Sequence, residues 1–385
     1  MFAPPEQIPI ECLTVLRPEP PAPSRTIDTS LAAQSIQSRP DQPATAMKLL
    51  PNAVKENPLQ RGLTMTMPQD EPVDVVYTWV DDQQPGYRGL LSQYAKDTRN
   101  SDPSRTRDNL QTLRFSMRSL ERYAPWVNHV YLLTCRPQVP DWLNIEHPKL
   151  TVVHHDEVMS PEILPTFNSL AIITHLHRIP GLARRFLYLE DDMLFLAPVS
   201  LRDFTSADGL QLVFEEKNPA PRLEHIADPA TAGGWNLALA QSNALLDQCY
   251  GRAERFQVNH SPLLIDKGRW EETLNRFPET LNVTRNSRFR SAGNFAPEFL
   301  YLQVLLAEQA ALLVKQRDAR KVAGYVPLEN FWPITAWRLW QVHRSQPKWV
   351  TLNDNFGQKP SKVTVALMRR QLQAWFPSRG EFERR

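Results

Sequence analysis

Cysteine is scarce in this sequence, and neither sign of charge is in excess. The three cysteines, Cys12, Cys135 and Cys249, lie far apart and form no C-x-x-C pair, which argues against a disulfide framework or a structural zinc site. Lys and Arg total 44 against 42 for Asp and Glu, so the net charge is only +2. Because a chain this balanced does not attract polyanions as a whole, we expect no nucleic-acid partner.

Long apolar runs are missing as well. No window of about 18 consecutive apolar residues occurs, as a membrane-spanning helix would require. Residues 1–11 also lack the basic start and apolar stretch of a secretory signal. These two absences predict a cytoplasmic protein.

Aromatic residues are nearly absent from the first 70 positions, where Phe2 stands alone, whereas 12 of the 34 prolines fall there. Such a segment cannot bury enough apolar surface to offset the entropy lost on ordering. We therefore predict a mostly disordered leader over residues 1–69, a catalytic domain over 70–358 and a basic C-terminal tail over 359–385.

Apolar patterning from Val73 onward predicts alternating strands and helices. Strands are expected at Val73–Val80, His129–Thr134, Leu150–His154 and Arg185–Leu189, with helices at Asp108–Tyr123 and Ser169–His177. This order is typical of an α/β sheet that is largely parallel. Further along we expect helices at Pro262–Arg276, Pro297–Val314 and Phe331–Val342, and a strand at Trp349–Leu352.

Three consecutive acids, Glu190, Asp191 and Asp192, follow the strand expected at Arg185–Leu189. Ligands of open α/β sheets bind beyond the carboxyl ends of the strands. Adjacent carboxylates there repel one another unless a cation neutralises them, and hard oxygen ligands suit Mg²⁺ or Mn²⁺. The alternative is an acidic surface turn, but the apolar flanks favour a metal or diphosphate site.

Other polar residues allow two interpretations each. Asp74, at the start of the first strand, is either a structural anchor or a nucleotide contact, since a buried carboxylate needs partners. Trp79 could stack on a base or pack in the core. His175, His177 and Arg178 suit phosphate binding or proton transfer, although structural histidines are commoner.

His260 precedes Pro262, which we expect to open a helix. The positive end of a helix favours anions, and a neutral histidine there is a credible general base. Downstream, Arg285, Arg288 and Arg290 fall within six residues. Guanidinium groups recognise phosphate bidentately, although an ordinary basic loop would have the same composition.

Taken in order, these segments resemble the Stealth family of capsular and exopolysaccharide phosphotransferases, which is related to the catalytic subunit of the animal N-acetylglucosamine-1-phosphotransferase. The resemblance rests on four ordered blocks. They comprise Val73–Asp81; Arg107–Val127 with Val139–Asn144, Leu164–Ser169, His175–Ile179 and Leu187–Asp192; His260–Asp266 with Phe289–Ser291; and Leu352–Phe356.

The resemblance implies transfer of a hexose 1-phosphate from a UDP-hexose or UDP-N-acetylhexosamine to a hydroxyl of a growing polysaccharide, with release of UMP. Asp191 and Asp192 would hold Mg²⁺ or Mn²⁺, Asp192 would also be catalytic, Arg290 would neutralise the transferred phosphate, and His260 would deprotonate the acceptor. The remaining substrate-binding candidates are Asp74, Trp79, Asp81, Arg107, Asn109, Asn168, His177, Arg178 and Asn294.

The fold predicted from these segments is α/β: a Rossmann-like, glycosyltransferase-A-like, mostly parallel sheet flanked by helices, with additional helical elements in the C-terminal half. Four positions depart from the family pattern, namely Leu170, Ile173, Glu190 and Asn294. A changed carboxylate could move a metal ligand, change the donor or weaken the enzyme.

Two other functions remain open at this point. An ordinary glycosyltransferase would move the sugar and release UDP, and a catalytically inactive relative would bind carbohydrate without turnover. The basic tail of residues 359–385 carries seven Lys or Arg against two Glu, which predicts weak attraction to anionic lipid at the inner face of the cell membrane.

Overall fold

A computed structural model of the protein describes residues 71–95, 106–229 and 231–385. All of them belong to one of the two compact units into which the chain divides. The predicted leader, residues 1–69, lies outside the described residues.

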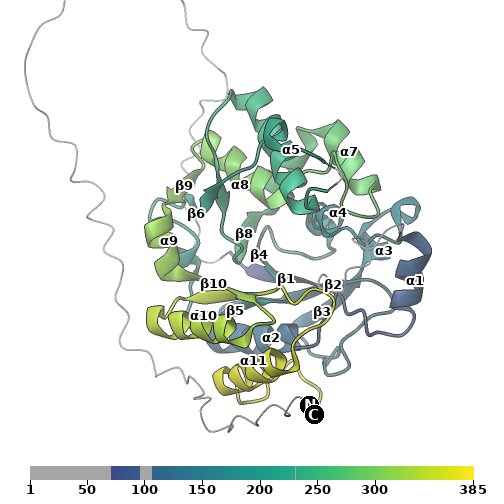
Figure 1. Ribbon diagram of the computed structural model, residues 1–385, viewed down its shortest axis with the longest axis vertical. Coiled ribbons are helices and arrows are strands. Elements are labelled where there is room, and N and C mark those ends of the chain that lie inside the picture. Colours follow the sequence, from purple (N-terminus) through teal and green to yellow (C-terminus); the bar gives the residue numbers. More distant parts are fainter. Residues whose placement is uncertain (1–70, 96–105, 230) are drawn as a thin grey trace, which may run out of the picture. The chain divides into compact units, whose positions relative to one another are not determined.

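A five-stranded sheet in the order β3-β2-β1-β4-β8 positions the site (Figure 1). The first four strands in this order are parallel, and β8 runs antiparallel to β4. Their bounds are β1 Val73–Trp79, β2 Val130–Thr134, β3 Leu150–His154, β4 Arg185–Glu190 and β8 Leu263–Asp266. The predicted α/β class with a mostly parallel sheet is therefore confirmed.

Both faces of this sheet are covered, which explains why its strands are continuous apolar runs. Successive side chains of a strand point to opposite faces. Accordingly Val75 and Tyr77 belong to one hydrophobic cluster, whereas Val76 belongs to a second cluster.

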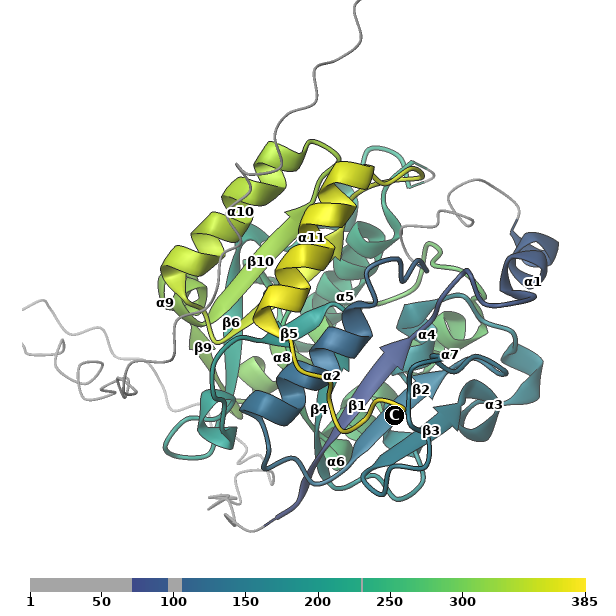
Figure 2. The same ribbon diagram turned by 90° about the horizontal axis from the view of Figure 1, so that it is seen from below.

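Different helices cover the two faces. The first cluster includes residues of α2 (Thr112–Tyr123), α10 (Trp332–Ser345) and α11 (Lys362–Trp375). The second includes residues of α4 (Ser169–Ile173), α5 (Gly234–Tyr250), α6 (Lys267–Asn275), α7 (Pro278–Asn286) and α8 (Pro297–Ala307). Figure 2 shows α2 and α11 lying over the same face of the sheet.

Two three-stranded sheets extend the fold. One has the order β10-β11-β5, and the other has the order β7-β6-β9. The remaining bounds are β5 Met193–Phe195, β6 Gln211–Pro219, β7 Phe256–Val258, β9 Ala311–Val314, β10 Ala323–Leu328, β11 Trp349–Asp354, α1 Tyr87–Tyr94, α3 His155–Val158 and α9 Gln316–Val322.

Two predicted helices are wrong over part of their length. Leu263–Asp266 is strand β8, and the helix begins only at Lys267. Ala311–Val314 is likewise strand β9, beyond the end of α8. In both cases pairing with a neighbouring strand, β4 or β6, determines the conformation of a short apolar run that a helix would also tolerate.

The segment predicted as a basic tail forms α11 and a final stretch that includes Phe382, and both contribute buried side chains to the first cluster. Among the described helices, none is long and apolar enough to cross a bilayer.

Candidate functional site

A cleft with a volume of about 410 Å³ lies where β1, β4, β10 and β11 reach their carboxyl ends. This is the position at which open α/β sheets bind ligands. Seven residues proposed from the sequence line it: Trp79, Arg107, Asn109, Glu190, Asp191, Asp192 and Arg290.

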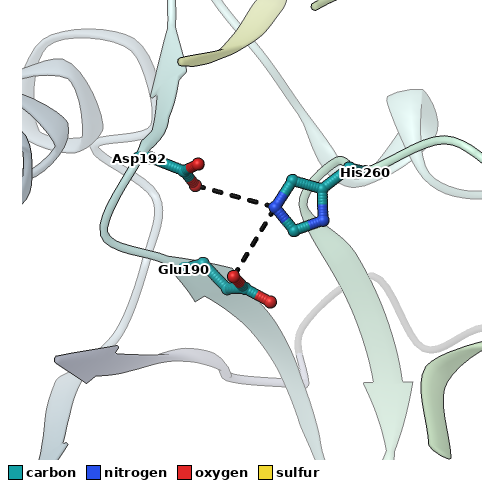
Figure 3. A group of neighbouring side chains, drawn as sticks. All are labelled: Glu190, Asp192 and His260. Carbon is teal, nitrogen blue, oxygen red and sulfur yellow. Dashed lines mark ion pairs between the residues drawn. The ribbon is translucent and has the colours of Figure 1, made fainter. Parts of the chain in front are cut away.

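Glu190, Asp192 and His260 form a close cluster at this end of the sheet (Figure 3). Nε2 of His260 lies 3.5 Å from a carboxylate oxygen of Glu190 and 3.7 Å from Oδ1 of Asp192. Two segments of opposite direction create this contact, because His260 lies just before β8 and Glu190 ends β4.

Asp191 points elsewhere. Its carboxylate accepts a hydrogen bond of 3.0 Å from the Thr112 hydroxyl at the start of α2. Asp191 and Asp192 form the turn between β4 and β5, and this turn directs their two side chains to different sides. Of the two metal ligands predicted from the sequence, the structure therefore brings Asp192 to His260 and places Asp191 on the side of α2.

Two members of the cluster, Glu190 and His260, have shifted pKa values. Burial raises the pKa of Glu190, and the charge of Asp192 adds to this while His260 opposes it. Burial alone would lower the pKa of His260, but the carboxylates of Glu190 and Asp192 outweigh it and raise the pKa to about 10. Without another cation in the cluster, His260 is thus protonated at neutral pH.

The donor atoms suit a divalent cation. One ligand atom from each of Glu190, Asp192 and His260 lies within 4.8 Å of the others. Oδ1 of Asp192 is buried and has no hydrogen-bond partner among the described residues. A buried oxygen left without a donor is costly, and carboxylate oxygens with an imidazole nitrogen are common ligands of first-row divalent metals.

The expected helix before which His260 would lie is absent, since Leu263–Asp266 is a strand. The helix begins only at Lys267, so its N-terminus does not directly follow His260. Its position is set instead by β8 and by a hydrogen bond of 2.6 Å that the Thr351 hydroxyl in β11 donates to its carbonyl oxygen.

Arg290 is one of two arginines that line the cleft. Its guanidinium donates to the Ser169 hydroxyl at 2.6 Å and lies 5.9 Å from the centre of the Trp235 ring. Its charge lowers the pKa of both Glu190 and Glu298. Arg285 and Arg288 instead bind carbonyl oxygens of Thr174 and Pro165, as expected for an ordinary basic loop.

Arg107 and Trp79 are held by acids that sequence reasoning did not select. Arg107 forms a bidentate pair with Asp354 at 2.9 and 3.0 Å. The Trp79 indole donates to Asp108 at 2.9 Å. Burial raises the pKa of Asp108 to about 7, although this indole hydrogen bond lowers it.

Asp74 lies outside the cleft, at the opposite end of β1. It is buried and accepts hydrogen bonds from Nδ2 of Asn128 at 2.8 Å and from the amide of Ala183 at 2.7 Å. Of the two interpretations of Asp74, this geometry matches the structural anchor. Its two hydrogen bonds tie the start of β1 to the segments that lead into β2 and β4, the strands that pair with β1.

Asn168 and Asn294 are buried against each other. Asn168 caps α4 and donates to Oδ1 of Asn294 at 3.0 Å, which fixes the segment that carries Arg290. Asp81 accepts from the amide of Gln83. His177 is buried near Glu271, and Arg178 is exposed. The cleft is not lined by any of five predicted site residues, namely Asp81, Asn168, His177, Arg178 and Asn294.

Sequence reasoning missed Glu298 completely. It lies in the first turn of α8, and its Oε2 is buried without a partner in the described part of the chain. Burial and the charge of Glu190 raise its pKa to about 7. No sequence pattern could identify Glu298, since it opens an otherwise apolar helix.

Leu170 and Ile173, two positions that depart from the family pattern, are core residues of the second cluster. They do not reach the cleft. Glu190, in contrast, lies at the centre of the candidate metal cluster.

Two segments match conserved regions of one protein family. Residues 105–213 match Stealth protein CR2, conserved region 2, and residues 259–305 match Stealth protein CR3, conserved region 3. The cluster uses both segments, because Glu190 and Asp192 lie in the first and His260 in the second.

Several curated proteins are similar to this chain. An exopolysaccharide phosphotransferase of Streptomyces coelicolor is 40% identical over 61% of this chain and 40% of its own length. A capsular polysaccharide phosphotransferase of Haemophilus influenzae is 30% identical over 67% of this chain and 73% of its own length. An exopolysaccharide phosphotransferase of Lactiplantibacillus plantarum is 32% identical over 60% of this chain and 74% of its own length. The chain thus spans only about two fifths of the Streptomyces relative.

Solved structures of low similarity also match. The bifunctional glycosyltransferase WbbM aligns with 73% of this chain and 46% of its own, at 12% identity and a TM-score of 0.38. The galactosyltransferase LgtC, in complex with donor and acceptor sugar analogs, aligns with 77% of this chain and 95% of its own, at 10% identity and a TM-score of 0.37.

Proposed function

This chain belongs to the Stealth family, and from that membership we propose that it is a polysaccharide phosphotransferase. It transfers a hexose 1-phosphate from a UDP-hexose or UDP-N-acetylhexosamine to a hydroxyl of a capsular or extracellular polysaccharide. The acceptor oxygen forms a bond to the phosphorus next to the sugar, the bond from that phosphorus to UMP breaks, and a phosphodiester results.

The observation that carries this proposal is that groups for three chemical roles meet at one end of the sheet. Carboxylates for a cation, an imidazole for a proton and a guanidinium for a phosphate surround the carboxyl ends of β1 and β4. Phosphoryl transfer needs little covalent chemistry from the protein and depends on positioning and charge stabilisation.

Glu190 and Asp192 would hold Mg²⁺ or Mn²⁺. Magnesium sites commonly use one or two carboxylates together with substrate phosphates. Once bound, the cation would offset the charge of the donor diphosphate and, by neutralising the two carboxylates, lower the pKa of His260 toward the physiological range.

His260 can either bind the cation or accept a proton, because Nε2 has one lone pair and this nitrogen faces both carboxylates. We assign it the proton of the acceptor hydroxyl, since the two carboxylates already provide the usual protein ligands. Arg290, which also lines the cleft, neutralises the transferred phosphate. Arg107, Asn109 and Trp79 line the part of the cleft assigned to the nucleotide.

The test is to incubate the purified full chain with Mg²⁺, a panel of UDP-hexoses and capsule-type oligosaccharides, and to identify the released nucleotide by ion-exchange chromatography. UMP that appears only with acceptor supports the proposal. UDP would assign the chain to ordinary glycosyl transfer, and the absence of any nucleotide would leave a binding protein.

Variants connect the product to the cluster. Asp192→Asn should lower UMP release at least about 100-fold, in line with the loss of a group that stabilises transition-state charge. Asp208→Asn, at an exposed carboxylate outside the cleft, is the matched control and should leave release unchanged.

A further inference from the structure

The outer face of α10 is apolar, unlike that of an ordinary surface helix. Thr335, Leu339 and Val342 are buried and face the protein. On the opposite side of the helix, Trp337 and Trp340 are 50% and 46% exposed. A helix of a globular protein normally presents polar residues there.

The apolar surface continues beyond α10. Phe331, Ile334 and Val363 are also large, exposed hydrophobic residues. Val363 belongs to the start of α11, which is tied to the start of α10 by a hydrogen bond from the Ser361 amide to Oδ1 of Asn330. We call Phe331, Ile334, Trp337, Trp340 and Val363 the α10 stripe; both views show α10 and α11 side by side (Figures 1 and 2). Contiguous apolar patches of this kind mark interaction surfaces.

In the two helices that carry most of the stripe, every charged residue is basic. Residues 332–345 and 362–375 contain no Asp or Glu, whereas the chain as a whole has almost equal numbers of both signs. Their basic residues other than histidine are Arg338, Arg344, Lys362, Arg369 and Arg370. An occupant of this surface is therefore expected to be anionic as well as apolar.

The arrangement of the rings favours a lipid surface over a glycan. The Arg338 guanidinium lies 4.8 Å from the centre of the Trp337 ring, and that of Arg344 lies 5.7 Å from the Trp340 ring. Sugars stack on open ring faces, but here each ring has a guanidinium over one face. Ile334 and Val363 offer no ring at all, and no member of the stripe lines the cleft.

We propose that the α10 stripe and its basic surroundings bind the surface of an anionic lipid bilayer. Trp and Phe side chains with neighbouring aliphatic residues insert at the level of the headgroups. Arginine and lysine side chains attract the anionic headgroups, each adding to binding at low salt. This goes beyond the proposed phosphotransferase activity, which needs only a soluble donor and acceptor.

The experiment is co-sedimentation of the full chain with vesicles of phosphatidylcholine alone or with 30% phosphatidylglycerol. We expect binding to the anionic vesicles that weakens with salt. Trp337→Ala/Trp340→Ala should lower the partition coefficient at least about tenfold. Ile145→Ala/Leu223→Ala removes exposed apolar residues that lie outside the stripe and should bind like the unmodified chain.

A second measurement does not depend on the folding of a variant. Vesicles that contain brominated phosphatidylcholine should quench part of the tryptophan fluorescence of the unmodified chain, since Trp337 and Trp340 lie on the stripe. No quenching and no co-sedimentation would overturn the proposal, as would a double variant that binds vesicles as well as the unmodified chain.

Two further results would also overturn it. The unmodified chain could fail to bind vesicles but bind an anionic polysaccharide through Trp337 and Trp340, which would make the stripe a glycan platform. It could instead form a dimer that Trp337→Ala/Trp340→Ala dissociates, which would make the stripe a contact between copies of this chain.

Discussion

The charge of His260 depends on two carboxylates, and Glu190 contributes more than Asp192 by charge alone. Glu190→Gln removes that contribution, so the pKa of His260 should fall from about 10, because the protonated imidazole loses one of its two carboxylate partners. The measurement is the pH titration of the His260 ring by NMR without divalent cations. Glu271→Gln, at an exposed carboxylate near His177, should leave the titration of His260 in place.

Sequence reasoning identified most side chains of the site but not their pairing. It selected Asp191 and Asp192 together, since consecutive acids after a strand predict a cation site. It could not decide which of them shares a side with His260, because that depends on how β4 ends and on where β8 approaches. Asp108, Asp354 and Glu298 escaped notice because each becomes significant only through a partner distant in the chain.

Among the helices, α5 packs against Arg290 through its first residue, Gly234. A Cβ atom added at Gly234 would lie 2.9 Å from Cβ of Arg290, whereas one added at Gly233 would meet nothing within 4 Å. Gly234→Ala should therefore displace Arg290 and lower UMP release about tenfold or more, as small misplacements of a catalytic group do. Gly233→Ala, measured in the same assay, is the matched control and should be close to the unmodified chain.

The incorrect helix at Pro262–Arg276 shows why element boundaries are difficult to predict from one sequence. Its apolar residues satisfy a helical period as well as a short buried strand. One indication of the true boundary was present, since Asp266 is a favourable first cap and accepts hydrogen bonds from the amides of Gly268 and Arg269. The decisive contribution is pairing with β4, which depends on tertiary structure.

For the molecule as a whole, the C-terminal segment contributes to stability through Glu383. This buried carboxylate forms a bidentate pair with the buried Arg118 at 2.6 and 3.0 Å. Glu383→Gln leaves a buried guanidinium without its counter-ion and should lower the free energy of unfolding by about 3 kcal/mol. Glu381→Gln, at a neighbouring exposed position, should change it by less than about 0.5 kcal/mol in the same urea titration.

Acid should destabilise the molecule through its buried histidines. Burial is the main cause that lowers the pKa of His155, His175 and His177, to about 4, 3 and 4. Unfolded histidines titrate near 6.5, so between that pH and about 4 the unfolded state binds protons that the folded state does not. Stability therefore falls as the pH falls, by up to about 2 kcal/mol per histidine at pH 5.

The check is urea unfolding of the unmodified chain and of His175→Gln between pH 5 and 7.5. The variant should lose stability less steeply below pH 6.5. His225→Gln, at an exposed histidine, should follow the slope of the unmodified chain; an equal slope in His175→Gln would contradict the assignment.

The central parallel strands could be predicted because they are apolar runs between turn residues, and α2 could be predicted because its apolar residues recur at helical spacing. The two small sheets could not, since strands such as Met193–Phe195 and Phe256–Val258 have three residues each and exist through pairing with distant segments. The antiparallel position of β8 likewise has no local signature.

The antiparallel pairing of β8 with β4 also sets the position of His260 relative to Glu190. Tyr188 pairs with Leu263, so Glu190 lies two residues beyond this pair on one strand and His260 three residues beyond it on the other. A slip of one residue would turn the β8 side chains to the other face, and a slip of two would move His260 by about 7 Å along β4. An inserted or deleted residue at Ser261–Pro262, which belong neither to β8 nor to either hydrophobic cluster, should thus move His260 and abolish the proton transfer assigned to it.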